Sequence, residues 1–410
     1  MTFFRLKTRE EVLALYPRFS PTAPENVGLL EASGRVLAKT VVAPEDLPSF
    51  PKAAMDGYAV RAQDTFGASP GMPQYLTLQG EVAIGTIPDK AIMPGEALRL
   101  PTGGMLPQGA DAVVMLEYTA EHPDQTLEVR RPMAPGENVL QPGEDVRRGE
   151  MLFPAGWRLR PQDVGLLAAL GIITVPVHRR PLVAIISSGD EIVPVSQPPG
   201  PAQVRDSNAY LVAAQVEEGG GEPFLWGIVA DDYLSLKNAL AGAVAEADLI
   251  LISGGSSVGA RDLTLKALQD LPGAEVLVHG VSIRPGKPTI LAAVGGKPLL
   301  GLPGHPASAA LVMHILGQPL LARLTGAQQA TSALGRTIKA KLSRNLAGAS
   351  GREDFVRVRL RLEDEVLWAD PVLGPSGLLS PMVKSDGLVI IPLGVEGLNQ
   401  GEEVKVQLFK

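Results

Sequence analysis

Four short segments of this chain combine turn-forming residues with side chains that could do chemistry. Two of them, Ser187-Ser-Gly-Asp-Glu191 and Ser253-Gly-Gly-Ser-Ser-Val-Gly259, follow apolar runs typical of buried strands. At such a strand end Glu191 could hold a divalent ion or a proton, and a turn or helix cap is the alternative. The glycine-rich segment could seat a phosphate, because its N–H groups can approach an anion where a helix begins. It has neither the Walker nor the dinucleotide spacing, so a plain tight turn stays the alternative.

The other two segments are loops stiffened by proline. Ile283-Arg-Pro-Gly-Lys-Pro288 presents Arg284 and Lys287 on a restrained backbone. Rigid cations suit phosphate or oxyanion recognition because little side-chain entropy is lost on binding, and a solvated basic turn is the alternative. Leu302-Pro-Gly-His-Pro306 precedes a helical pattern, so its amides could meet an anion. His305 could act as a base, but a lone histidine in a proline turn is more often structural.

The composition restricts the class of protein. The chain has 410 residues, which suggests about three domains, and 45% hydrophobic with 20% charged residues is typical of globular proteins. The absence of cysteine excludes disulfides, thiolate zinc sites and cysteine nucleophiles. A formal net charge of −7 argues against a nucleic-acid partner. With no signal peptide and no continuous apolar stretch of about 18 residues, we expect a cytoplasmic protein that does not span a membrane.

Hydrophobic patterning predicts the elements of the first half. Thr8 and Glu11 form a capping box ahead of a first helix, and a second helix over 25–32 and a strand over 36–42 are expected next. Short strands between glycine and proline turns then predict an inserted β domain from about 48 to 133. These strands are expected at 75–78, 97–100, 112–116 and 127–129.

From residue 180 strands alternate with helices, which indicates parallel βαβ units. The strands are expected at 183–186, 224–229, 249–252 and 299–302, and helices at 207–217, 262–271 and 307–324. Ser207 is the expected cap of the first helix, and Asp231 with Asp232 caps another that ends at 245. The glycine-rich and acidic segments follow these strands, where ligands bind in such sheets. Period-two alternation over 355–362 and 403–409 predicts a barrel-like terminal β domain.

Ten motifs along the chain resemble the MoeA family, the molybdopterin molybdenumtransferases, which include the E domain of gephyrin. They are AAMDGYAVR, RLPTGG with GADAVVMLE, PGENVLQPGEDVRRGE, RRPLVAIISSGDEIV, RDSNAY, GIVADD, ISGGSSVGARDLT, IRPGKP, GLPGHPASA and GREDFVRV. They occur in the family's order and cover essentially the whole chain. Each motif alone is weak, but ten in register are highly specific.

The resemblance implies a multidomain fold that is α/β plus β. Its parts are a discontinuous linker domain (1–46 and 135–179), an inserted β domain (47–134), a molybdopterin-binding α/β domain with a parallel sheet like that of MogA (180–328) and a C-terminal β-barrel (329–410). It also implies a homodimer in which each active site joins the α/β domain of one chain to the insert of the other.

The reaction is implied in the same way. Molybdate is inserted into the dithiolene of adenylyl-molybdopterin, whose pyrophosphate is hydrolysed so that AMP leaves, and Mg²⁺ or a similar hard cation is expected on oxygen ligands. Transient contacts with the adenylyltransferase that supplies the substrate and with molybdoenzymes that accept the cofactor are expected. Molybdate and tungstate are nearly the same size, so both stay open as the oxyanion.

The family's functional positions transfer to this chain one by one. The expected catalytic residues are Asp56, Thr102, Asp145, Glu191, Asp231 and Asp262, of which Glu191, Asp231 and Asp262 would hold the metal. The expected substrate-binding residues are Gly254, Gly255, Ser256, Gly259, Arg284, Lys287, Pro303, Pro306, Arg352 and Ser376. By residue type alone, Asp56 and Thr102 would be ordinary turn residues.

Three positions depart from the family's pattern. STGDE reads SSGDE here, so Ser188 keeps the hydroxyl of the usual threonine. GLPGNP reads GLPGHP, so His305 replaces the usual asparagine beside the expected molybdate pocket and could alter oxyanion affinity or its pH response. The glutamine often found before Ser376 is missing.

Two other functions stay open. The same fold could serve as a scaffold without catalysis, as gephyrin also clusters receptors, although the retained acids Glu191, Asp231 and Asp262 argue against this. The α/β site could also belong to a general nucleotide or sugar-phosphate hydrolase. Activity on simple nucleotides without release of AMP from adenylyl-molybdopterin would favour the hydrolase.

Overall fold

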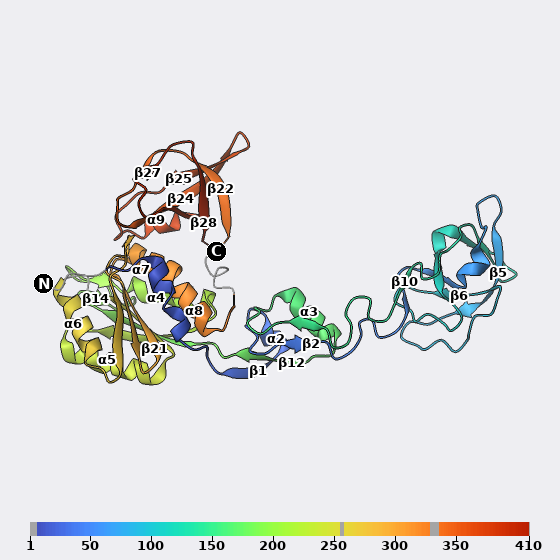
Figure 1. Cartoon of the computed structure of the whole chain (residues 1–410), viewed down its shortest axis with the longest axis horizontal. Helices are drawn as coiled ribbons and strands as arrows, with labels where there is room; N and C mark the ends of the chain where they lie inside the picture. The colour runs from blue at the N-terminus through green and yellow to red at the C-terminus, as the bar shows by residue number, and fades with distance from the viewer. Residues whose placement is uncertain (1–5, 255–257, 329–335, 410) are drawn as a thin grey trace. The chain divides into compact units, whose positions relative to one another are not determined.

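The computed structural model describes residues 6–254, 258–328 and 336–409 (Figure 1). The chain forms two compact units, and each is discontinuous in sequence. Unit 1 comprises Met1–Lys39, Ala155–Arg160 and Thr174–Lys410, and unit 2 comprises Thr40–Pro154 and Pro161–Ile173. The finer five-part division of the chain stays a prediction.

Unit 1 is built on a six-stranded sheet with helices on both faces. Its strand order is β16 (Glu222–Val229), β13 (Leu182–Ser188), β17 (Leu249–Gly254), β21 (Lys297–Leu302), β20 (Ile290–Val294), β18 (Ala274–His279). β13 pairs in parallel with β16 and β17, and β17 with β21. Val183 and Ile185 enter one hydrophobic core, and Ala184 and Ile186 enter the other. Both faces of β13 are therefore buried, as is usual in parallel sheets.

The helices of unit 1 divide between the two faces of this sheet (Figure 1). One face is covered by α1 (Arg9–Leu13), α4 (Ser207–Glu218), α7 (Pro306–Val312) and α8 (Gln318–Leu324), and the other by α5 (Tyr233–Glu246) and α6 (Val258–Gln269). A π-helical turn, Met313–Gly317, lies between α7 and α8. Among the described residues one helix, Pro306–Leu324, is long and apolar enough to cross a membrane, but 89% of its apolar window is buried inside the protein.

Two strands at one edge of the sheet run antiparallel to their neighbours. β20 pairs antiparallel with both β21 and β18. Gly295 and Gly296 join β20 to β21 with φ of 57° and 80°, a two-residue hairpin turn that favours glycine. The expected α/β class is confirmed, and the parallel strands are those that lead into the glycine-rich and acidic segments. Alternation of strands and helices alone does not reveal the hairpin.

Five strands close into a barrel in the C-terminal part of unit 1. Their order is β24 (Glu353–Glu363), β25 (Val366–Pro371), β22 (Thr337–Leu342), β28 (Glu403–Leu408), β26 (Gly387–Ile391), and β26 pairs back with β24. The short strand β19 (Ile283–Arg284) leaves the α/β domain and pairs in parallel with β24. The proline-stiffened loop of one domain is thereby hydrogen-bonded to the barrel, and the predicted barrel is confirmed.

Unit 1 also contains smaller elements. They are a 3-10 turn (Tyr16–Arg18), the antiparallel pair β1 (Pro24–Gly28) and β12 (Thr174–His178), α2 (Leu29–Ala32), the parallel pair β14 (Ile192–Val193) and β15 (Val204–Arg205), the antiparallel pair β23 (Leu346–Ala347) and β27 (Gly397–Leu398), and α9 (Ser380–Val383).

Unit 2 contains the inserted β structure. Its six-stranded sheet has the order β7 (Ala112–Met115), β4 (Gly57–Val60), β6 (Glu96–Leu100), β5 (Gln74–Glu81), β9 (Thr126–Val129), β8 (Thr119–Glu121). The other elements are β2 (Val41–Val42) with β11 (Met151–Phe153), β3 (Lys52–Ala53) with β10 (Val139–Leu140), α3 (Pro161–Ala169) and the 3-10 turns Ala62–Thr65 and Leu116–Tyr118. The four strands expected here from the sequence are confirmed.

The predictions of one helix, one strand and one helix cap need correction. Residues 25–32 do not form one helix, because β1 pairs antiparallel with β12 and only α2 is helical. The expected strand over 36–42 is reduced to β2 and isolated bridges at Val36 and Leu37. Asp206 rather than Ser207 caps α4, by accepting from the Ala209 N–H at 3.1 Å. The capping box of Thr8 and Glu11 on α1 is confirmed.

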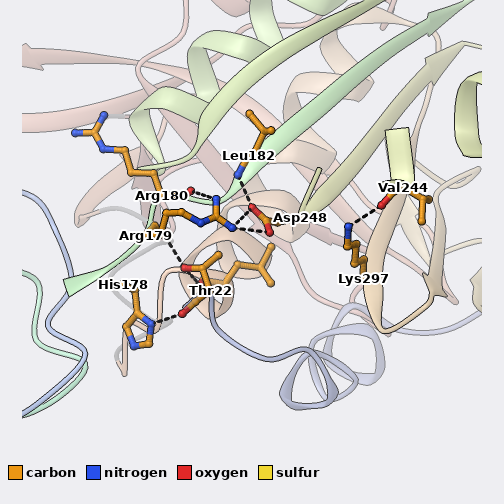
Figure 2. A network of polar contacts seen from close by, with 9 residues as sticks. Thr22, His178, Arg179, Arg180, Leu182, Val244, Asp248 and Lys297 are labelled. Carbon is orange, nitrogen blue, oxygen red and sulfur yellow. Dashed lines mark hydrogen bonds and ion pairs between the residues drawn. The ribbon is translucent and has the colours of Figure 1, made fainter. Parts of the chain in front are cut away.

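One carboxylate ties the start of β17 to the start of β13, where the chain enters the sheet (Figure 2). Asp248, just before β17, accepts from Arg179 Nη2 at 2.8 and 2.9 Å and from the Leu182 N–H at 2.7 Å. The hydrogen bonding of the Arg179 guanidinium to Asp248 raises the pKa of Arg179 above its ordinary value. Thr22 Oγ1 donates to the carbonyl of Arg179, and His178 Nδ1 lies 2.7 Å from the Thr22 carbonyl oxygen. The network holds the neighbouring strands β13 and β17 in register at their first residues.

Replacing Asp248 with asparagine is expected to lower the free energy of unfolding by about 1 kcal/mol. This value allows for solvent screening of the ion pair, because the Arg179 side chain is 44% exposed. Urea unfolding followed by circular dichroism measures the change. The control is Glu403→Gln, which removes an ion pair with Lys339 whose two side chains are 60% and 70% exposed. It should change stability much less than Asp248→Asn, because solvent screens an ion pair between two exposed side chains. Equal losses in the two variants would contradict a special role for Asp248.

Candidate functional site

A cavity of about 560 Å³ lies between the α/β domain and the barrel of unit 1. Six of the predicted binding residues line it: Gly254, Arg284, Lys287, Pro303, Arg352 and Ser376. Its floor includes the last residues of β17 and β21, and barrel residues 350–352 and 376 complete its wall. The cavity therefore lies at the carboxyl ends of parallel strands, where ligands bind in such sheets.

A buried carboxylate orients two of the cavity's cations. Asp354 is 1% exposed, and its Oδ1 accepts from Arg284 Nε at 3.0 Å and from Arg352 Nε at 3.1 Å. Its Oδ2 accepts from the Ala349 N–H at 3.0 Å. The pairing of β19 with β24 places Arg284 directly opposite Asp354. Both ion pairs use Nε, so as far as the described residues show, the Nη nitrogens of each guanidinium can face a ligand.

The loop that carries Lys287 is rigid for reasons visible in its packing. Gly286 has φ of +116°, and a Cβ there would lie 2.7 Å from Val312 Cγ2 of α7. Thr289 Oγ1 donates to the Gly286 carbonyl at 2.7 Å, and the Val281 N–H donates to the Lys287 carbonyl at 2.9 Å. Lys287 itself is exposed. The cavity thus gathers three cations in a chain whose net charge is −7, which suits an oxyanion.

Gly254 of the glycine-rich segment lines the same cavity. Gly254 has φ of +134°, and a Cβ there would lie 1.9 Å from the Ser188 carbonyl oxygen, so only glycine fits. Gly255 and Ser256, both predicted to bind phosphate, lie outside the described residues. Gly259 lies in the first turn of α6. Pro306 is the first residue of α7, next to residues of the cavity wall but not among them.

The three predicted metal ligands do not line the cavity. Asp231 accepts from Ser188 Oγ, and its N–H donates to Asp190 Oδ1 at 3.1 Å. It does not cap α5 as expected, because Asp232 alone accepts from the Leu234 and Ser235 N–H groups, both at 3.0 Å.

The two remaining acids are exposed, and Asp262 lies on α6. In the part of the chain that the structure describes, no three carboxylate or imidazole groups gather into a metal cluster. The assignment of Glu191, Asp231 and Asp262 to a metal therefore stays a prediction.

Three predicted catalytic residues belong to unit 2. Asp56 Oδ1 accepts from the Thr102 N–H at 2.8 Å, and this bond holds the pKa of Asp56 below its ordinary value. The two turns that carry this acid and this hydroxyl are therefore neighbours. Asp145 is an exposed turn residue whose N–H donates to the Leu47 carbonyl at 3.0 Å.

Sequence reasoning missed residues that line the cavity and the carboxylate that orients two of its arginines. Asp354 lies in the GREDFVRV motif, and the signal that could have found it is an acid placed between an arginine and a strongly alternating strand. Thr264 and Ser308 add hydroxyl groups to the wall. His305, which the resemblance to the family placed beside the expected molybdate pocket, does line the cavity, and its Nδ1 lies 2.8 Å from Ser376 Oγ.

Comparison with known proteins covers nearly the whole chain. Residues 6–171 match the family described as the MoeA N-terminal region (domain I and II), residues 184–323 match a probable molybdopterin binding domain, and residues 339–409 match the MoeA C-terminal region (domain IV). The chain belongs to the MoeA family.

Individual relatives of the MoeA family agree with this assignment. A Nostoc sp. protein named molybdopterin molybdenumtransferase is 35% identical, over 97% of this chain and 92% of the relative. The Bacillus subtilis protein of the same name is 32% identical, over 94% of this chain and 90% of the relative. The crystal structure of a molybdopterin biosynthesis MoeA protein from Pyrococcus horikoshii OT3 matches with a TM-score of 0.85 and 33% identity, covering 99% of this chain and 100% of the other.

Arg352→Gln is expected to weaken binding of a tetrahedral oxyanion such as molybdate or sulfate about tenfold, because a charge-assisted hydrogen bond is lost from the cavity. Isothermal titration calorimetry measures the affinity. The matched control is Arg359→Gln, an exposed residue that does not line the cavity and belongs to β24, the strand that begins directly after Arg352. An equal loss in Arg359→Gln would show that only the overall charge of the barrel matters.

Proposed function

We propose that this chain inserts molybdate into adenylylated molybdopterin in the cytoplasm, releasing AMP and the finished molybdenum cofactor. Membership of the MoeA family along the whole chain supports the proposal, as do relatives named molybdopterin molybdenumtransferase. The observation that carries it is the cavity in which Arg284, Lys287 and Arg352 meet at the strand ends. Permanent cations held there are suited to a tetrahedral dianion and to a phosphate beside it.

The roles of individual side chains follow from their positions. Arg284 and Arg352, held through Nε by Asp354, would direct their free nitrogens at the molybdate, and Lys287 would add a mobile charge. The Gly254 turn lines the same cavity and would seat a substrate phosphate. Because these groups are positioned before the substrate arrives, they can stabilise charge that develops as the phosphate bond breaks.

A hard divalent cation fits the carboxylates near this cavity. Asp231 is bonded to Ser188, whose carbonyl packs on Gly254 of the cavity wall, so its carboxylate lies close to the expected phosphate. Mg²⁺ is commonly held by one or two protein carboxylates together with phosphate oxygens and water, which needs no preformed cage. Asp231 and Glu191 would hold it, with Asp262 as a third candidate. When bound, it would neutralise charge on the pyrophosphate.

A homodimer with composite active sites is part of the proposal. Asp56, Thr102 and Asp145 lie in unit 2, away in sequence from the cavity residues of unit 1, and in this arrangement a partner subunit would supply them. The outer strand β16 supports association, because Phe224, Leu225 and Ile228 are each at least 36% exposed along an unpaired sheet edge.

The remaining parts of the proposal follow the family. The domains are proposed at 1–46 with 135–179, 47–134, 180–328 and 329–410. Protein contacts would be transient, with the adenylyltransferase before the reaction and with molybdoenzymes after it. The same function leaves no role for a nucleic acid or a membrane.

Incubation with adenylylated molybdopterin and Mg²⁺ should release AMP only when molybdate is present. Glu191→Gln should lower turnover at least about a hundredfold while changing substrate affinity less than about threefold, because its charge acts on the reacting phosphate. Glu246→Gln, an exposed acid at the far end of α5, is the control and should behave like the wild type. Tight binding without AMP release would instead indicate a scaffold, and molybdate-independent cleavage of simple nucleotides would indicate a general hydrolase.

Mixing two inactive variants tests the composite site. Asp56→Asn and Glu191→Gln should each be inactive alone, but subunit exchange should restore about a quarter of wild-type activity, because half of the dimers then carry one intact site. Steady-state AMP release after exchange measures the recovery. The control is a mixture of Asp231→Asn and Glu191→Gln, both in unit 1, which cannot restore a site. Absence of recovery in the first mixture, with exchange demonstrated by labelled subunits, would rule out sharing of the site between subunits.

A further inference from the structure

Two side chains from different domains meet at the wall of the cavity. His305 comes just before α7, and Ser376 lies in the barrel segment between β25 and α9. His305 Nδ1 and Ser376 Oγ are 2.8 Å apart, and the Ala307 N–H donates to the Ser376 carbonyl at 3.1 Å. The backbone bond fixes the position of Ser376, while its hydroxyl remains free to rotate.

The histidine occupies a position where a shorter polar residue would serve the helix. His305 is the N-cap residue of α7, yet its side chain makes no capping hydrogen bond. Asparagine is among the residues that cap a helix best. In this chain the ring bonds to Ser376 instead, so the residue at this position acts on the cavity rather than on the helix.

We infer that the protonation of His305 controls oxyanion binding, by setting the direction of its hydrogen bond to Ser376. This inference rests on the proposed function, in which the cavity holds molybdate. A serine hydroxyl has one proton to donate. When Nδ1 is bare, Ser376 donates to the ring and presents only lone pairs to the cavity. When the ring is an imidazolium, Nδ1–H donates to Oγ, and the hydroxyl proton is free for the anion.

The charge of the ring affects anion binding in addition to the direction of its hydrogen bond to Ser376. A neutral ring with its proton on Nδ1 can also donate to Ser376, but it brings no positive charge. The imidazolium has Nδ1–H in every case and adds a fourth cation to Arg284, Lys287 and Arg352. Both effects strengthen binding of a dianion, so affinity rises as pH falls.

The charged groups of the cavity beside the ring are Arg284, Lys287 and Arg352, and Asp354 lies behind the two arginines. In the cavity wall, as far as it is described, His305 is the imidazole, the type of side chain that changes its charge between about pH 5 and pH 8. A bound dianion favours the imidazolium over the neutral ring, so binding is coupled to uptake of a proton.

Calorimetric titration of the full chain with sulfate, at about pH 5.5 and about pH 8, tests the inference. Sulfate is tetrahedral like molybdate and stays a dianion throughout this range, and micromolar molybdate repeats the experiment with the proposed substrate. The wild type should bind about tenfold more tightly at the lower pH. Repeating the titration in buffers of different ionisation enthalpy should show uptake of up to one proton.

Three variants separate the proposed switch from a structural role. His305→Asn should bind with nearly the same affinity at both pH values and take up no proton, and His305→Gln repeats the test if the loop of the first variant is disturbed. Ser376→Ala should lose more affinity at the lower pH than at the higher, because only there is its hydroxyl free to donate. Thermal unfolding establishes that each variant is folded.

The possible failures are distinguishable. A wild-type pH dependence and proton uptake that persist in both folded His305 variants would overturn the switch and leave the oxyanion site intact. Absence of saturable sulfate and molybdate binding by the wild type at either pH would instead overturn the site itself, and with it the proposed function.

Discussion

The buried carboxylate of Asp354 is the contact on which the cavity depends. It faces Arg284 from the α/β domain, and Arg352 and the Ala349 N–H from the barrel, so both domains contact its two oxygens. A buried charge without partners would destabilise the fold by several kcal/mol. Arg284 is the partner from the α/β domain, so its ion pair with Asp354 links that domain to the barrel. The interaction that joins the domains is also the one that positions the cations for a ligand.

Backbone geometry makes this arrangement rigid. β19 adds to β24, with the Glu353 N–H donating to the Ser282 carbonyl at 2.8 Å, so the loop is anchored on the barrel by its main chain. On its other side Gly286 packs against α7 too closely for any side chain. Cations on such a loop lose little entropy when an anion binds, which offsets part of the desolvation of a dianion. Local geometry thus outweighs a net charge of −7 that would repel anions at long range.

Local patterns in the sequence correctly predicted the parts of the fold that depend on interactions between residues close together in the chain. The capping box at Thr8, the buried parallel strands and the alternating barrel strands are each encoded within a dozen residues. Residues 25–32 were misread because β1 is stabilised by pairing with β12, about 150 residues away in the chain. The role of Asp354 was not predicted because it also depends on a distant residue. Its partner Arg284 lies 70 positions earlier in the chain, and no spacing rule connects the two. Gly254, Arg284 and Lys287 were found because glycine and proline at strand ends have a local meaning.

Two departures from the family's pattern differ in what they do to a hydrogen bond. Ser188 keeps the hydroxyl of the usual threonine, and that hydroxyl donates to Asp231, so the acid keeps its anchor. His305 keeps a polar group but replaces an amide, which always has both a donor and an acceptor, with a ring whose donors depend on protonation. The first change is neutral because one donor replaces another. The second makes the direction of the hydrogen bond between His305 and Ser376 depend on the protonation of the ring.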